Sequence, residues 1–209
     1  MSKNNLQPWN KGRHVGPRQS LTVNEVAAIL KSLKQRNSAH DLCLFSVAID
    51  TMLRASDLIQ LRVSDVVDAR GEVVDFFHWR QKKTSGNVSP VLTQKTKTTI
   101  RLWIMASGKR PSHYLFTRKK SIDSDPITVG FYRQLIKEWV TEIGLPSGHY
   151  SAHSLRRTKA QYMYGRGVSI EIIGLLLGHQ NTASTIRYLG IDQAAAYDAA
   201  IKQDILGRS

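Results

Sequence analysis

Apolar residues recur at helical spacing along most of this 209-residue chain, in runs that end at glycine or proline. Thr22-x-x-Glu25 and Ser38-x-x-Asp41 each have the form of a capping box in front of such a run. We therefore expect helices at 23–34 and 39–52, and a short helix after Arg54. The same pattern predicts further helices at 94–106, 128–143, 153–166, 169–177, 182–189 and 192–204.

Two segments break the helical pattern. Residues 73–80 and 88–92 are rich in β-branched and aromatic residues, and the polar, turn-forming segment 82–87 joins them. They predict an antiparallel hairpin that carries lysines near its tip. The expected fold class is therefore mainly α with a small antiparallel β-sheet, an α+β arrangement.

The chain is long enough to bury one substantial core. Residues 1–20 are polar and basic with several Gly and Pro, which predicts a flexible basic arm. Residues 21–209 are expected to form one domain that ends in a C-terminal helix. The starting methionine and the arm favour an intact chain, while a fragment of a longer protein stays open.

The chain is strongly basic, with a formal net charge of +14. Such a charge points to a polyanionic partner, and nucleic acid fits better than a membrane surface because the basic residues do not share one amphipathic helix. No apolar run approaches the roughly 18 residues of a spanning helix, and no signal peptide is visible. We expect a cytoplasmic, nucleoid-associated protein, with Cys43 in the core and no cysteine-based metal site.

Two polar residues stand together on the expected helix at 153–166. His153 and Arg156 are three residues apart, so they share a face, and their imidazole and guanidinium could meet one phosphate. A histidine at a helix start and a surface ion pair would explain the same two residues.

A histidine and a tyrosine follow near the end of the chain. An apolar run stops at Gly178, a usual helix end, and His179 comes next. Tyr188 lies nine residues after that histidine. A solvated histidine and a core tyrosine packed beside Ile186 and Leu189 are the open alternatives.

Taken in order, these segments resemble the tyrosine recombinase (phage integrase) family, in its catalytic domain. That family has an arginine in T-G-x-R-x-S-E-L-x-x-L, a lysine in a β-hairpin, H-x-L-R, L-G-H, and a tyrosine nine residues after that histidine. The resemblance covers roughly 21–204, and the matching segments are Thr51 to Leu61 with Arg54, then Lys83, His153 to Arg156, Leu177 to His179, and Tyr188.

The match has two departures and one ambiguity. Met52 replaces the usual glycine, and Asp57 replaces a glutamate but keeps a carboxylate that we expect to support the region of Arg54. Lys82 and Lys83 are neighbours on a hairpin, so only one is expected to face the site. Lys83 is favoured because Gln-x-Lys-Thr before the return strand is the closer family match.

The resemblance implies a role for each of these residues. Tyr188 would attack a DNA phosphate and form a 3′-phosphotyrosine, with His153 as general base or proton relay. Lys83 would protonate the leaving 5′-oxygen. Charge on the nonbridging oxygens would be stabilised by Arg54, Arg156 and His179. Neither a metal nor a cofactor is expected.

The resemblance also implies partners. Double-stranded DNA is the expected substrate, steered by a basic set that we assign to Arg62, Arg80, Lys82, Arg157 and Lys159. Monomers would assemble into a homotetramer on two synapsed sites, with accessory DNA-bending or partner proteins. No N-terminal core-binding domain is expected before the catalytic domain, as in the compact fimbrial phase-variation invertases.

Integration, excision and inversion of DNA all fit this expectation equally. Two other classes stay open at this point: a type IB topoisomerase-like enzyme, which shares the tyrosine and arginine chemistry, and a non-catalytic DNA-binding regulator built on the same fold.

Overall fold

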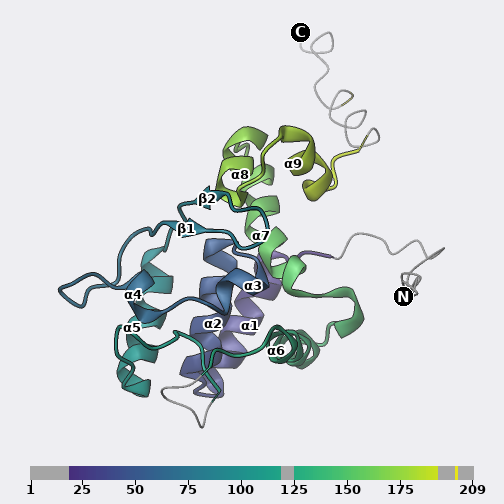
Figure 1. Ribbon diagram of the computed structural model, residues 1–209. Helices are drawn as coiled ribbons and strands as arrows, with labels where there is room; N and C mark the ends of the chain where they lie inside the picture. The colour runs from purple at the N-terminus through teal and green to yellow at the C-terminus, as the bar shows by residue number, and fades with distance from the viewer. Residues whose placement is uncertain (1–18, 119–124, 193–200, 202–209) are drawn as a thin grey trace, which may run out of the picture.

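The computed structural model describes residues 19–118, 125–192 and 201 (Figure 1). The expected arm at 1–20 and the expected helix at 192–204 lie almost wholly outside these residues. Elsewhere the helices begin and end within a residue or so of their predicted bounds: α1 Val23–Gln35, α2 Ala39–Thr51, α3 Ala55–Leu58, α5 Gln94–Ser107, α6 Val129–Glu142, α7 Ala152–Gly165, α8 Ile170–Leu177 and α9 Thr182–Leu189. Two short elements were not predicted, α4 Val63–Val66 and the 3₁₀ helix η1 Ser147–His149.

Only one of the two predicted capping boxes forms. At α1, the backbone N–H of Glu25 donates to Thr22 Oγ1 at 3.2 Å, and that of Thr22 donates to Glu25 Oε2 at 2.7 Å. At α2 the prediction was wrong, because Ser38 makes no side-chain capping bond. The Asp41 carboxylate lies instead 2.7 Å from Nδ1 of His40.

The hairpin is present, but its strands are shorter than predicted. β1 Trp79–Arg80 pairs antiparallel with β2 Asn87–Val88. The strands expected at 73–80 and 88–92 were too long, because Pro90 has no N–H to continue the ladder. Beyond it the contact reduces to isolated bonds such as Leu92 N–H to the Asp75 carbonyl, 2.7 Å. The fold class, mainly α with a small antiparallel sheet, is confirmed.

Two apolar clusters hold the helices together. The larger one surrounds α2, which lies centrally in Figure 1 and packs on α1, α5 and α7. Cys43 is fully buried in it, as expected, and burial raises the pKa of its thiol. The smaller cluster joins α7, α8 and α9 through Ala160, Ile173, Leu177 and Leu189. Helix α7 contacts elements on both sides and so connects the two clusters.

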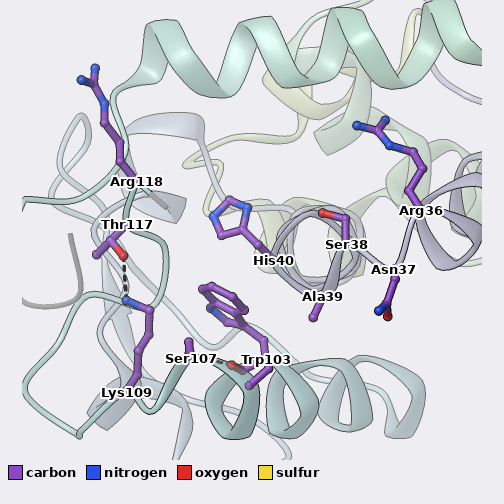
Figure 2. A pocket seen from close by; sticks show the side chains of 11 residues that line it. Arg36, Asn37, Ser38, Ala39, His40, Trp103, Ser107, Lys109, Thr117 and Arg118 are labelled. Carbon is purple, nitrogen blue, oxygen red and sulfur yellow. Dashed lines mark hydrogen bonds between the residues drawn. The ribbon is translucent and has the colours of Figure 1, made fainter. Parts of the chain in front are cut away.

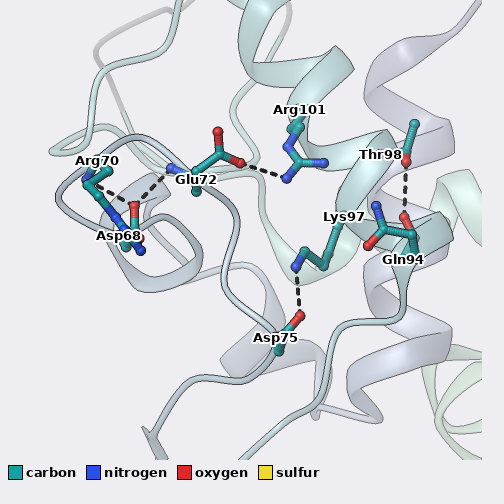
Figure 3. A network of polar contacts seen from close by, with 8 residues as sticks. All are labelled: Asp68, Arg70, Glu72, Asp75, Gln94, Lys97, Thr98 and Arg101. Carbon is teal, nitrogen blue, oxygen red and sulfur yellow. Dashed lines mark hydrogen bonds and ion pairs between the residues drawn. The ribbon is translucent and has the colours of Figure 1, made fainter.

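Polar contacts hold the segment between α4 and β1 against α5 (Figure 3). Lys97 and Arg101 of α5 pair with Asp75 at 2.6 Å and with Glu72 at 2.7 Å. The Asp68 carboxylate closes the turn by accepting from the backbone N–H of Glu72 at 2.9 Å. Exposed pairs of this kind contribute about 0–1 kcal/mol each, so their main effect is to position the segment that leads into the hairpin.

A pocket of about 530 Å³ lies between the start of α2 and the end of α5 (Figure 2). Inside it the ring of His40 meets Trp103 edge to face, with 5.0 Å between centroids, and Lys109 Nζ donates to Thr117 Oγ1 at 2.8 Å. This pocket is at the opposite end of α2 from Arg54, about 20 Å away for a helix of this length.

In the described part of the chain, no helix has the length and apolar character to cross a membrane.

Met52 ends α2 in the left-handed conformation, with φ 51° and ψ 26°. Glycine adopts this conformation without steric cost, which explains the glycine of the family motif at this position. The Met52 side chain is nevertheless 4% exposed, and it is the member of the smaller cluster that comes from the N-terminal half of the chain. It therefore contributes packing that glycine lacks.

We predict that Met52→Gly destabilises the protein. Relief of the left-handed strain is worth about 1–2 kcal/mol, whereas deleting a buried methionine costs about 2–5 kcal/mol. The net loss should be about 1–3 kcal/mol in the free energy of unfolding measured with urea. Asn37→Gly is the matched control, because Asn37 also has a left-handed φ, 52°, but is outside both clusters. That variant should change stability by at most about 0.5 kcal/mol, because asparagine adopts the left-handed conformation at much lower cost than methionine. A stabilised Met52→Gly would contradict the packing role.

Candidate functional site

A cleft of about 850 Å³ opens between the hairpin tip, α6 and the start of α7. Arg54, Lys83, His153 and Arg156 all line it. These four residues were predicted from three separate motifs that span about a hundred positions of the chain, and the fold brings them together. Arg133 and Lys137 of α6 line the same cleft. Sequence reasoning missed both, because a basic residue on an amphipathic helix normally indicates only a solvated face.

Arg54 is held by a buried glutamine. Arg54 is the N-cap residue of α3, and its Nη1 donates to Gln81 Oε1. The same oxygen accepts from Thr84 Oγ1 at 2.8 Å. Gln81 is only 2% exposed, and its Nε2 donates to the Leu177 carbonyl at 3.1 Å. Sequence reasoning did not assign Gln81 to the site. Its place in the Gln-x-Lys-Thr segment was the one available signal.

Arg156 reaches the same carbonyl from the other side. It is 3% exposed, and its Nη2 donates to the Leu177 oxygen at 2.8 Å. This oxygen belongs to the last residue of α8, where the helix dipole favours a cation. The other terminal nitrogen, Nη1, is buried and has no hydrogen-bond partner among the described residues. Arg156 therefore has a fixed guanidinium with one unused donor.

The glycine before His179 lets the hairpin pack closely against the end of α8. Gly178 has φ 67°, and a Cβ at this position would lie 2.6 Å from Val88 Cγ1 and 2.9 Å from the Gln81 amide. Any larger residue would push β2 away from α8. The turn places His179 with Nδ1 3.0 Å from Thr185 Oγ1 of α9.

Tyr188 packs against the smaller cluster and lies beside the site, so its core and functional interpretations are compatible. Its ring meets that of His179 edge to face, with centroids 5.4 Å apart. The guanidinium carbons of Arg156 and Arg157 lie 5.9 and 5.8 Å from its ring centroid. The hydroxyl is buried and makes no hydrogen bond of regular geometry among the described residues, but the Arg156 guanidinium lies close enough to favour its ionised form.

The electrostatics of the site favour neutral side chains at its centre. Burial raises the pKa of Tyr188 to about 12, although Arg156 and Arg157 oppose this rise. Burial, with Arg156 and Arg54 adding to it, lowers the pKa of His179 to about 4. The pKa of His153 is also lowered, by burial first and then by Arg156 and Arg54. Both imidazoles are therefore neutral near pH 7.

The two hairpin lysines differ in their surroundings. Lys83 lines the cleft, whereas Lys82 does not. The backbone N–H of Lys82 donates to Asp57 Oδ1 at 3.0 Å, and Asp57 is fully buried on α3. The Asp57 carboxylate thus joins the helix that follows Arg54 to the hairpin, in place of a direct contact with the arginine.

The five residues assigned to DNA steering are not equivalent in the structure. Arg62, Arg80 and Lys82 are exposed, and the guanidinium of Arg62 lies 4.1 Å from the ring centroid of Tyr114. Arg157 is buried beside Tyr188, and Lys159 Nζ pairs with Asp50 Oδ1 at 2.5 Å. The last two are less exposed than the other three, because Arg157 is 8% exposed and the side chain of Lys159 is 23% exposed; their part in phosphate steering stays a prediction. Helix α7 is covered on several sides, and its sequence did not reveal this.

Metal ligands do not cluster in the described ranges, where no group of three or more His, Cys, Asp or Glu side chains could hold an ion.

Comparison with known proteins places these motifs in a family. Residues 19–194 match the model of the phage integrase family. The chain is 25% identical over 186 residues to the tyrosine recombinase XerC of Caldanaerobacter subterraneus subsp. tengcongensis, covering 88% of this chain and 51% of that protein. It is 24% identical over 184 residues to the type 1 fimbriae regulatory protein FimB of Escherichia coli K12, covering 86% and 88%.

Solved structures share the fold. The crystal structure of the XerA recombinase matches with a TM-score of 0.72 and 18% identity, over 90% of this chain and 66% of that one. The XerH site-specific recombinase bound to its difH substrate, in a pre-cleavage complex, matches with a TM-score of 0.68 and 18% identity, over 87% and 53%. The chain thus spans about half the length of several relatives, and 51% of XerC. The family match over nearly the whole described chain shows that this protein belongs to the phage integrase family.

Proposed function

We propose that this protein is a site-specific tyrosine recombinase that cleaves and rejoins DNA strands through a 3′-phosphotyrosine intermediate. The observation that carries the proposal is the position of Arg156, which lines the cleft and also lies over the ring of Tyr188. The buried, unpaired Nη1 of Arg156 and the buried Tyr188 hydroxyl suit a phosphate that would accept from one and be attacked by the other. The family relatives named as recombinases support the same activity.

The reaction would proceed by transesterification. The Tyr188 oxygen forms a bond to phosphorus while the bond from phosphorus to the 5′-oxygen breaks. Because burial keeps the tyrosine protonated, its proton must leave during the attack, and neutral His153 is the proposed base. Lys83 gives a proton to the leaving 5′-oxygen. Attack by a 5′-hydroxyl from a second strand then reverses these steps and releases the tyrosine.

Charge on the phosphate would be balanced by fixed donors. Arg54 and Arg156 are each anchored by a hydrogen bond, so their guanidiniums need little reorganisation in the transition state. His179 would add one further donor. In this scheme the two guanidiniums supply the positive charge that a metal ion supplies in other phosphoryl transferases.

The DNA would lie along the exposed basic residues around the cleft. We assign phosphate contacts to Arg62, Arg80 and Lys82, and add Arg133 and Lys137 because they line the cleft itself. We further propose assembly of monomers into a tetramer on two synapsed sites, action at the nucleoid, and help from accessory DNA-bending proteins. The similarity to FimB over most of both chains makes a compact recombinase of that kind a fitting comparison.

The first prediction concerns Tyr188. On a nicked suicide substrate containing a site that the protein binds, the wild type should form a covalent protein–DNA adduct and Tyr188→Phe should form none. Binding should stay within about twofold, because phenylalanine keeps the ring packing. Tyr162→Phe, on an exposed tyrosine of α7, should behave like wild type. An adduct with Tyr188→Phe, or none with wild type on a bound site, would contradict the proposal, and relaxation of supercoils without strand exchange would indicate a topoisomerase.

The second prediction separates the two lysines. Lys83→Ala should slow cleavage by about 10²–10⁴-fold, as expected for loss of a general acid, and Lys82→Ala should slow it much less. Sulfur in place of the bridging 5′-oxygen leaves without a proton, so this substrate should restore cleavage by Lys83→Ala. If the sulfur substrate rescues Lys82→Ala instead, the assignment must be exchanged.

The third prediction concerns the cleft cations of α6. The affinity for DNA should fall as salt rises, and each lost phosphate contact should lower the slope of log K against log salt by about 0.9. Arg133→Ala with Lys137→Ala should therefore reduce the slope by up to about 1.8. Arg36→Ala is the matched control, since Arg36 pairs with Glu142 and lines the pocket at the far end of α2. Equal slopes in all three proteins would show that α6 does not contact the phosphates.

A further inference from the structure

The environment of His179 contains a residue that none of the motifs explains. Thr185, one turn before Tyr188 on α9, is 0% exposed, and its Oγ1 lies 3.0 Å from Nδ1 of His179. Helix α8 leaves room for this hydroxyl, because a Cβ on Gly174 would lie 2.8 Å from Thr185 Oγ1. The hydroxyl is therefore confined between two helices with its oxygen directed at the imidazole.

The direction of this hydrogen bond decides where the imidazole proton lies. A neutral imidazole has one N–H and one lone pair, and a hydroxyl can donate or accept. Within the described part of the chain, the contact with His179 is the one hydrogen bond of the Thr185 hydroxyl. If Nδ1 were the donor, the hydroxyl proton would be buried without an acceptor, which is costly. If the hydroxyl donates, both groups are satisfied and the imidazole proton lies on Nε2.

The alternative of a doubly protonated ring is disfavoured. An imidazolium would donate from both nitrogens and again leave the hydroxyl proton of Thr185 without an acceptor. Burial and the nearby guanidiniums of Arg156 and Arg54 also lower the pKa of His179 to about 4. The ring is thus neutral at pH 7, and its tautomer depends on its neighbour.

We propose that Thr185 is a positioning residue that donates to Nδ1 of His179 and keeps the proton on Nε2, which makes His179 a neutral hydrogen-bond donor to the phosphate. The effect on catalysis rests on the proposed function, whereas the tautomer does not. The other tautomer would direct a lone pair at an anionic oxygen, which repels it. Thr185 would therefore act on the reaction through His179 without touching the DNA.

The first test is spectroscopic and needs no DNA. Histidine ¹⁵N resonances of the full chain at pH 7, assigned with His179→Gln, report which nitrogen carries the proton. Wild type should show a single Nε2–H tautomer at His179. Thr185→Val, which replaces the hydroxyl with a methyl of similar size, should give a measurable share of the Nδ1–H form, and Thr185→Ser should restore the wild-type spectrum. An Nδ1–H tautomer in the wild type, or no change in Thr185→Val, would overturn the proposal.

The second test measures formation of the covalent adduct on a suicide substrate. Thr185→Val should slow it by about tenfold, and Thr185→Ser should stay within about threefold of wild type. Thr182→Val, an exposed threonine on the same helix, is the matched control and should have no effect. Equal melting temperatures show that the variants fold. A slow Thr185→Ser, or a fast Thr185→Val with an altered tautomer, would overturn the role of Thr185 in positioning. If wild type forms no adduct, the proposed function fails while the spectra still decide the tautomer.

Discussion

The carbonyl oxygen of Leu177 is the point on which the whole site depends. It accepts from Arg156 Nη2 at 2.8 Å and from Gln81 Nε2 at 3.1 Å, and Gln81 in turn accepts from Arg54. One backbone oxygen at the end of α8 thereby links two guanidiniums that come from different halves of the chain. Because backbone atoms move less than long side chains, the two cations are held in place before any phosphate arrives.

The two apolar clusters explain why the site forms where it does. Leu53, beside Arg54, and Val88 of the hairpin belong to the larger cluster, whereas Leu177 and Tyr188 belong to the smaller one. Arg156 links the two regions, because it lines the cleft and donates to the Leu177 carbonyl. Met52 is a direct apolar contact between the two regions, two residues from Arg54. The left-handed strain at Met52 is offset because its side chain packs in the cluster formed by α7, α8 and α9, the last of which carries Tyr188. At this position the chain therefore lacks the conformational freedom of glycine but has an apolar contact with the smaller cluster.

Much of this arrangement could be predicted from the sequence, because the signals were local. Helix limits followed from caps and glycine stops, and the cleft residues followed from short motifs that match a known family. The features that were missed depend on contacts between distant segments. Gln81 becomes a site residue only because α8 packs on the hairpin, and Lys159 is a paired cation only because Asp50 lies opposite it. The predicted strands were too long because Pro90 has no backbone N–H to donate, and the sequence already shows this proline. Ser38 had the right spacing for a cap, but its acidic partner binds His40.

The shortness of the hairpin decides which contacts position its tip. With only two residues of each strand paired, the tip that carries Lys83 is held mainly by the Asp57 carboxylate and the Gln81 amide. Both of these contacts are made to neighbouring helices, so the position of the tip depends on α3 and α8 more than on its own short ladder. The same two helices also fix the guanidiniums, because Arg54 stands at the start of α3 and Arg156 donates to the last residue of α8. A change in either helix would therefore displace Lys83 and an arginine together.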